Sequence, residues 1–191
     1  MLKFLSLFSC WLVLSGSISQ TPSAAFPDTP TITEKSVGKA RIGMTMARLK
    51  ELYKGSTYTP VYLYKYGFDE GSNIPNAVLV ASRGQKLFVY WQADKKIAGL
   101  IVLNPAYQTA KGIHVGATSG QLKAVFPTAT AGPHEFIEGM ELASAGFEEK
   151  SQLLYVFQKQ ASIRKDKDSA EPSEIVGTTA KISWILVKPN R

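Results

Sequence analysis

The chain has 191 residues, including 22 lysines and arginines against 15 aspartates and glutamates, and a formal net charge of +7. Its single cysteine, Cys10, excludes an intramolecular disulfide bond, and a mature chain without this residue has neither a thiol nucleophile nor a thiolate metal ligand. The basic residues form no stripe with stacking aromatic side chains, so the composition disfavours a nucleic-acid-binding protein.

Residues 1–19 have the pattern of a secretory signal peptide. Lys3 supplies a positive charge, residues 4–14 form an apolar run, and a small-x-small cleavage site ends at Ser19. The apolar run is too short for a helix across a hydrocarbon layer of about 30 Å. We therefore predict cleavage after Ser19, a mature chain without a transmembrane helix, and a periplasmic or secreted location. The alternative is a lipoprotein anchored at Cys10, which is disfavoured because the apolar run continues past it.

After a leader at residues 20–36, whose proline, threonine and serine content predicts flexibility, the sequence repeats itself. Residues 40–53 (ARIGMTMARLKELY) match residues 113–126 (IHVGATSGQLKAVF) at a shift of 73 positions. Self-similarity at a fixed spacing is typical of proteins built from repeated structural units. The repeat therefore predicts two copies of one unit.

Each copy of this motif predicts a short helix. Thr45 and Thr118 are expected N-caps, because a threonine hydroxyl accepts a hydrogen bond from an N–H group of the first turn. In the second copy Gln121 completes a capping-box pattern. Gly43 and Gly116, two residues before each cap, predict a tight turn into the helix.

Segments typical of strands follow each helix. In the first copy we predict strands at residues 60–66, 77–82, 86–92 and 96–103. In the second copy we predict strands at residues 135–142, 143–147, 152–159 and 179–188. Two pairs of these segments also match in sequence: residues 87–91 with 153–157 at a shift of 66, and residues 96–102 with 181–187 at a shift of 85.

The longest insertion in the second copy, at residues 161–178, is rich in charged side chains. We interpret it as an exposed loop that folding does not require, and its acidic residues as solvated rather than as calcium ligands. The predicted fold class is α+β, with two tandem units, each a short helix packed on a four-stranded antiparallel sheet. The units are expected at residues 37–104 and 105–191.

The segments VGKARIGMTMARLKELY and TAKGIHVGATSGQLKAVFP resemble the small exported modules of the beta-lactamase-inhibitor-protein fold. They are also similar to the SmpA/OmlA-like accessory modules of barrel assembly in the outer membrane. In those families a Gly-Met-Thr turn precedes a short helix and an antiparallel sheet, and the inhibitor family has two units in tandem. The resemblance implies an inhibitor of a secreted enzyme or an accessory factor in envelope assembly.

No motif selects a catalytic, cofactor or metal site. The sequence lacks a G-x-S-x-G elbow, a P-loop and a dinucleotide fingerprint. His134 and Glu135 match half of a zinc-protease motif, but Glu138 stands where the second histidine belongs. We interpret His134 as a polar residue facing water at the start of a strand, and His114 as part of a solvated strand edge. A hydrolase with a dispersed site remains the enzymatic alternative.

Tyr62, Tyr64 and Tyr66 are the candidate binding residues. On a strand these three side chains share one face, with Val61 and Leu63 on the other. Tyrosines are common at recognition surfaces because they combine an apolar body with a polar tip. The alternative is that they pack across strands or between the units. We expect an exported, non-enzymatic protein that binds a protein or another component of the cell envelope or extracellular space, without a cofactor.

Overall fold

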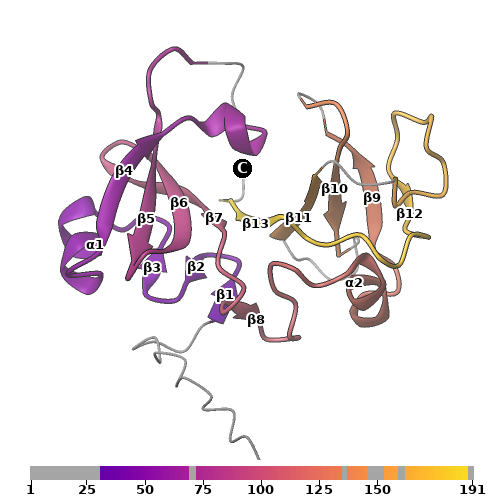
Figure 1. Ribbon diagram of the computed structural model, residues 1–191, viewed down its shortest axis with the longest axis horizontal. Helices are drawn as coiled ribbons and strands as arrows, with labels where there is room; N and C mark the ends of the chain where they lie inside the picture. Colours follow the sequence, from indigo (N-terminus) through magenta and orange to yellow (C-terminus); the bar gives the residue numbers. More distant parts are fainter. Residues whose placement is uncertain (1–30, 69–71, 135–136, 146–152, 159–161, 189–191) are drawn as a thin grey trace, which may run out of the picture.

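The computed structural model describes residues 31–68, 72–134, 137–145, 153–158 and 162–188 (Figure 1). The predicted signal peptide and most of the predicted leader lie outside these residues. Within them the fold is mostly β, with thirteen strands, two short α-helices and one 3-10 turn. None of the described helices has the length and apolar character needed to cross a membrane.

The larger sheet has nine strands in the order β12-β9-β10-β11-β13-β7-β6-β5-β4, and all neighbouring strands are antiparallel. Its strands are β4 (Thr57–Val61), β5 (Ala77–Ser82), β6 (Gln85–Ala93), β7 (Lys96–Val102), β9 (Thr130–Pro133), β10 (Met140–Ser144), β11 (Leu153–Gln158), β12 (Ser173–Glu174) and β13 (Trp184–Val187).

A second sheet of four short strands has the order β3-β2-β1-β8. Its strands are β1 (Thr31–Thr33), β2 (Ser36–Val37), β3 (Ala40–Arg41) and β8 (Gln108–Thr109). Ile32 and Val37 from this sheet join the main apolar core, as do Leu49 and Leu122 from the helices α1 (Met46–Leu52) and α2 (Ser119–Val125). The small sheet and both helices therefore cover the same side of the nine-stranded sheet.

The predicted helix starts are confirmed. The Thr45 hydroxyl accepts a hydrogen bond from the Arg48 backbone N–H at 3.4 Å. In the second copy the Thr118 hydroxyl accepts from the Gln121 N–H at 3.1 Å, and the Gln121 side chain accepts from the Thr118 N–H at 2.8 Å. The capping box predicted from the sequence is therefore present at α2.

The two repeated glycines make equivalent turns. Gly43 and Gly116 have φ angles of 83° and 91°, in the left-handed region that favours glycine. The Gly43 N–H donates to the Ile97 carbonyl at 2.7 Å, and the Gly116 N–H donates to the Ile182 carbonyl at 2.8 Å. The same motif therefore ties each helix to a later segment of its own half of the chain.

Replacing Gly43 with alanine should lower the free energy of unfolding by about 1–2 kcal/mol, the cost of a left-handed residue with a side chain. A Cβ atom at this position would have no neighbour within 4 Å, so the loss would report backbone strain alone. Gly43→Asn is the matched control, because asparagine tolerates this conformation better. Denaturant unfolding would measure both variants, and equal losses would contradict the explanation.

The predicted fold class of two α+β units, each with its own four-stranded sheet, is wrong. β13 pairs with β7 through Ile185 opposite Val102 and Leu186 opposite Ile101, which joins the two halves in one sheet. Both strands are buried on both faces, which is typical of central strands. Pairing them also removes two open strand edges. The four-stranded sheet and β12 were not predicted either.

The predicted match between the third strands is wrong by one residue. Tyr90 on β6 pairs with Leu100, and Tyr155 on β11 pairs with Ile185. Leu100 and Ile185 correspond at the shift of 85, so Tyr90 corresponds to Tyr155 at a shift of 65 rather than 66. The difference matters because a slip of one residue turns every side chain to the other face of the sheet.

Several predicted strands also have different bounds. Residues 60–66 were predicted as one strand, but β4 ends at Val61 and a 3-10 turn follows. Residues 135–142 and 143–147 were predicted as the first two strands of the second copy, but these strands are β9, which ends at Pro133, and β10 at Met140–Ser144. Of the predicted strand at residues 179–188, only Trp184–Val187 form β13. Residues 135 and 136, between β9 and β10, lie outside the described residues.

The charged insertion is packed at its base, so the prediction that folding does not require it is not supported. Ile163 and Ile175 are buried in the main core, and Arg164 is only 6% exposed. Residues 165–168 and 170–172 between these anchors are exposed, as predicted from their composition. Residue 161 lies outside the described residues.

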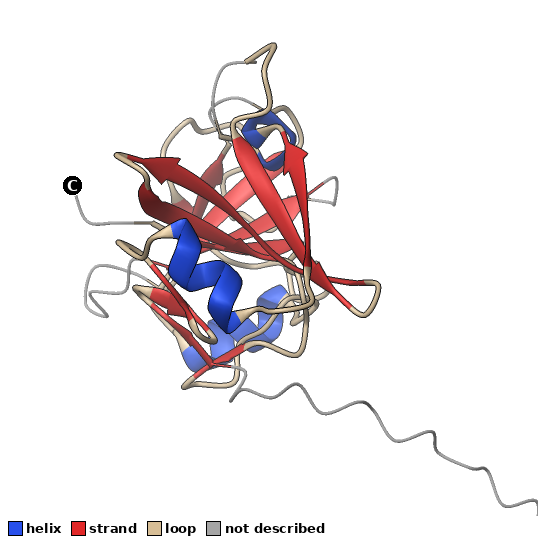
Figure 2. Cartoon of the chain, turned by 90° about the vertical axis from the view of Figure 1, so that its left-hand side faces the viewer, coloured by secondary structure: helices blue, strands red, loops and turns tan. Residues whose placement is uncertain are grey.

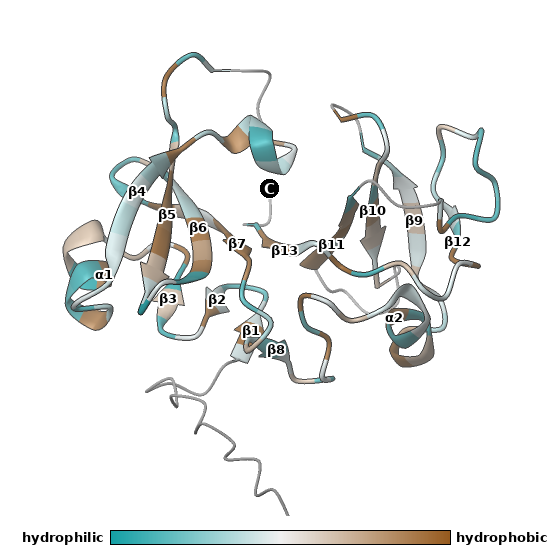
Figure 3. Cartoon of the chain, in the orientation of Figure 1, coloured by the Kyte–Doolittle hydropathy of each residue, from teal (hydrophilic) through white to brown (hydrophobic). Residues whose placement is uncertain are grey.

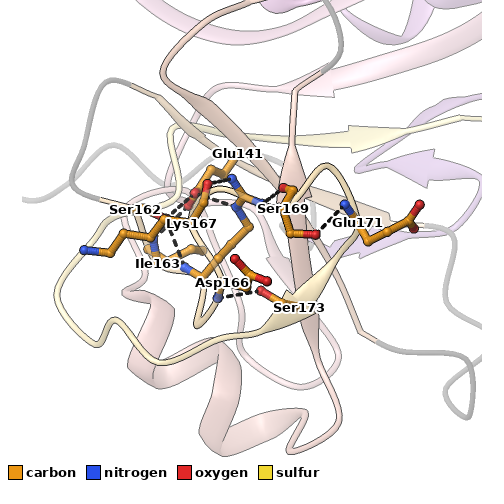
Figure 4. Close-up of polar contacts among 9 residues, drawn as sticks. Glu141, Ser162, Ile163, Asp166, Lys167, Ser169, Glu171 and Ser173 are labelled. Atoms are coloured by element: carbon orange, nitrogen blue, oxygen red, sulfur yellow. Dashed lines mark hydrogen bonds and ion pairs between the residues drawn. The ribbon is translucent and has the colours of Figure 1, made fainter.

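Polar contacts that include Glu141, Lys167 and Ser169 hold this insertion (Figure 4), and Arg164 is bonded to all three residues. Its Nε donates to the Glu141 carboxylate at 2.9 Å, while its two terminal nitrogens donate to the carbonyls of Ser169 at 2.6 Å and Lys167 at 2.8 Å. The same carboxylate also accepts from the Ile163 N–H at 2.8 Å. A buried ion pair therefore fixes the insertion to β10.

Candidate binding surface

The side of the nine-stranded sheet opposite α1 and α2 is called here the open face. A second apolar cluster lies on it, separate from the main core, with buried side chains from six adjacent strands including Val89, Ile101, Val156 and Trp184. Figure 2 shows α1 on one side of the sheet and the 3-10 turn on the other, and Figure 3 shows the hydrophobic residues along β5 and β7. Side-chain alternation along the strands thus divides the apolar residues between two cores.

The open face is only partly covered. Nine side chains packed against its cluster remain half-buried, and we call this set the apolar surface. Its members are Val61, Tyr66, Phe68, Leu79, Trp91, Leu103, Ile137, Leu142 and Leu154.

One segment crosses the open face, and we call residues 62–68 the strap. It contains the 3-10 turn η1 (Leu63–Tyr66). Phe68 stacks on Trp91, with ring centroids 6.3 Å apart and planes at 16°, and meets the His134 ring edge-on at 6.1 Å. The strap therefore joins the first half of the chain to a residue that follows β9. Gly67, with φ at 86°, lies so close to His134 that a Cβ atom would clash with the imidazole.

The three candidate tyrosines lie on this strap and not on a strand, so the predicted alternation between two faces is wrong. The Tyr62 and Tyr64 rings pack together at 5.4 Å, with the Lys65 ammonium 5.4 Å from the Tyr62 ring, and Tyr64 is 40% exposed. Tyr66 instead meets Trp184 edge-on at 5.7 Å. Burial raises the pKa of the Tyr66 hydroxyl above its usual value. Tyr62 and Tyr64 thus form an outward pair, whereas the Tyr66 ring packs inward.

The reason for the turn is local. The Leu63 N–H, which would belong to the sheet if β4 continued, donates to the Asn76 side chain at 2.9 Å. The turn closes through the Phe68 N–H to the Leu63 carbonyl at 3.2 Å. Gly67 ends it in a left-handed conformation that favours glycine. Gly67, which directly follows the four residues of the turn, was the sequence signal for it, and the tyrosine spacing was not.

His134 does not face water, contrary to the prediction. It is 8% exposed, its Nδ1 accepts from the Ile137 N–H at 3.3 Å, and its ring packs against Phe68. His114 is half-buried and its Nδ1 lies 2.8 Å from the Val115 carbonyl oxygen. Across the described ranges, no group of three or more His, Cys, Asp or Glu residues has the arrangement of a metal site.

Two tryptophans lie on the open face, one from each half. Trp91 on β6 pairs with Gly99 on β7, where a Cβ atom would clash with the indole ring. Trp184 on β13 pairs with Val156 on β11. The Trp184 indole N–H is buried and has no acceptor within the described part of the chain. Sequence reasoning missed both residues, although each lies in a repeated segment that was recognised.

No protein-family model matches the chain, and no curated protein matches its sequence. Its structure is similar to the crystal structure of the uncharacterised protein YfeY from Escherichia coli, with a TM-score of 0.54. The two chains are 15% identical, and the match covers 83% of this chain and 99% of YfeY. The likeness is one of fold. It confirms neither family suggested by the sequence resemblance.

Proposed function

We propose that this protein is an exported, non-enzymatic binding protein of the cell envelope or extracellular space, and that it holds its partner on the apolar surface. The observation that carries this proposal is the contrast between the two sides of the sheet. Among the described residues, the core under the helices and the second sheet has 30 buried apolar side chains and eight half-buried ones packed against them, whereas the cluster on the open face has eight buried and nine half-buried. Large exposed apolar patches commonly mark interaction sites in soluble proteins.

The composition of this surface favours binding over catalysis. Eight of its nine members are aliphatic, Phe or Trp side chains, which supply contact area but cannot transfer a proton or attack a substrate. Two titratable side chains next to this surface, Tyr66 and His134, pack their rings against Trp184 and Phe68. A general acid or base must instead reach its substrate by a hydrogen bond.

The three tyrosines take different roles in this proposal. Tyr62 and Tyr64 form an outward pair on the strap, so we assign them to the rim of the contact with the partner. Tyr66 stabilises the strap by packing its ring against Trp184. Rim contacts contribute less to affinity than buried anchors, so the half-buried leucines are expected to matter more than Tyr64.

Binding of the amphiphilic dye anilinonaphthalene sulfonate to the folded protein tests whether the surface is available. We expect dye fluorescence to rise with wild-type protein and to fall strongly with Leu154→Glu, because a carboxylate opposes burial of the adjacent apolar area. Leu52→Glu on α1 is the matched control, since Leu52 is also half-buried but packs against the main core. Equal dye binding by the folded Leu154→Glu variant would contradict the proposal.

A further inference from the structure

We propose that the protein binds the surface of an anionic phospholipid membrane with the side that carries the small sheet and the two α-helices. This inference goes beyond the proposed function and does not depend on it, because the apolar surface lies on the other side of the nine-stranded sheet. Three observations support it: the distribution of charge, the recurrence of one lysine position in both halves, and the type of basic residue.

The charged residues are divided unequally within the described chain. We call the small sheet, the two helices, their turns and the segments that pair with the helix starts the basic side. It has eleven basic and three acidic residues, whereas the rest of the described chain has seven basic and six acidic residues. The basic residues of this side are Lys35, Lys39, Arg41, Arg48, Lys50, Lys54, Lys95, Lys96, Lys111, Lys123 and Lys181, and the acidic ones are Glu34, Glu51 and Asp94. Most of the net positive charge of the described residues therefore lies on one side.

Strand and bridge contacts bring basic residues from separate segments together on this side. Arg41 pairs with Ser36 across β2 and β3, which places it beside Lys35. Thr45, four positions after Arg41, pairs with Lys96. The three basic residues are all exposed. Figure 1 shows the small sheet between α1 and α2 along the lower edge of the view, so both halves of the chain contribute to the basic side.

The repeat places a lysine at the same position in each half. Thr45 at the start of α1 pairs with Lys96, and Thr118 at the start of α2 pairs with Lys181. The two lysines correspond at the shift of 85, and both are exposed. Residues 95–134, which supply much of this side, contain neither aspartate nor glutamate. The excess of positive charge is thus a property of both copies.

The type of basic residue favours a broad anionic surface over a single phosphate group. Nine of the eleven are lysines, whose ammonium groups act as point charges, whereas arginine is typical of bidentate phosphate recognition. Many lysines spread over one side suit many headgroups at once, because each lysine near an anionic membrane adds to the attraction.

The contact is expected to be electrostatic, without insertion into the hydrocarbon layer. The large exposed apolar side chains of the described chain are Tyr64, Ile74 and Val176. They belong to the strap, the segment before β5 and the charged insertion, and thus not to the basic side. Amphipathic elements that insert into a membrane carry such side chains on the bound face. Binding should therefore be reversible by salt.

Co-sedimentation with lipid vesicles tests this proposal, with the protein purified after export. We expect binding to vesicles of phosphatidylserine and phosphatidylcholine in equal amounts, and none to vesicles of phosphatidylcholine alone. Raising the salt concentration from about 0.1 M to about 1 M shortens the Debye length from about 10 Å to about 3 Å. This change should release the protein from the anionic vesicles.

Paired substitutions locate the contact. Lys96→Gln with Lys181→Gln, and separately Lys35→Gln with Arg41→Gln, should each weaken vesicle binding by roughly fivefold for each charge removed. Lys165→Gln with Lys167→Gln is the matched control, because these exposed lysines of the insertion carry the same charge but lie outside the basic side. The control should bind like wild type, and circular dichroism would establish that all three variants are folded.

Binding to phosphatidylcholine alone, binding that persists at about 1 M salt, or an equal loss in the matched control would overturn the membrane proposal. Equal affinity for duplex DNA at the same phosphate concentration would also overturn it, since the basic side would then bind any polyanion. The folded Leu154→Glu variant should bind the vesicles like wild type. Loss of vesicle binding in that variant would place the membrane contact on the open face and contradict the proposal.

Discussion

Replacing Arg164 with methionine is expected to lower the free energy of unfolding by about 3–5 kcal/mol, the usual cost of removing one partner of a buried ion pair. Glu141 would keep a carboxylate that is buried beside the main core, without its charged partner. The carbonyls of Ser169 and Lys167 would lose their donor as well. Denaturant unfolding of the variant would measure the loss.

Lys165→Met is the control for this prediction. Lys165 is adjacent in sequence and exposed, so the same substitution should change stability by no more than about 0.5 kcal/mol. The double variant Glu141→Leu with Arg164→Met should recover part of the loss, because it leaves no unpaired charge. A loss for Arg164→Met as small as that for Lys165→Met would show that the insertion is not fixed by this pair.

Replacing Tyr66 with alanine is expected to cost about 2 kcal/mol, from the buried apolar area and the edge-on contact with Trp184. Tyr64→Ala is the matched control on the same strap, and its ring is 40% exposed. It should change stability by about 0.5 kcal/mol or less. Thermal melts of the two variants measure this difference directly.

The reverse order, with Tyr64→Ala the more destabilising variant, would contradict the description of the strap. Tyr66→Phe provides a further check, because it keeps the ring that meets Trp184 and should retain most of the stability. A large loss of stability for Tyr66→Phe would show that the hydroxyl group, rather than the ring contact, stabilises the strap.

The features that the sequence predicted correctly depend on short-range signals. The caps at Thr45 and Thr118 and the turns at Gly43 and Gly116 involve hydrogen bonds and dihedral angles within a few residues. These signals are easier to recognise because each of them occurs in both copies of the motif. The repeat thus predicted both helices.

The features that were missed depend on contacts between distant residues. Ile185 meets Val102 across β13 and β7, and the sequence of a strand does not specify which other strand it pairs with. The uninterrupted apolar runs at both strands were the available signal, since strands buried on both faces lose alternation. Similarly, Arg164 lies in a charged segment that predicts exposure. It is buried because it pairs with Glu141, which is distant in the sequence.

The prediction that the three candidate tyrosines lie on a strand is wrong. The tyrosine spacing suggested one face of a strand, whereas the structure folds Tyr62, Tyr64 and Tyr66 into a 3-10 turn across the open face. Three tyrosines at alternate positions fit both a strand and a short turn, so their spacing alone does not distinguish between the two structures. Trp91 and Trp184 could be assigned to one surface only after the strand register was known.

The central claim is that the open face holds a partner in the cell. Site-specific photo-crosslinking tests it most directly, with benzoylphenylalanine placed at Leu154 and Leu79 on the open face and at Leu52 on α1, in cells that produce and export the protein. The account predicts adducts, detected by mass, at both open-face positions and none at Leu52. Adducts only at Leu52, or no adduct at either open-face position, would contradict it.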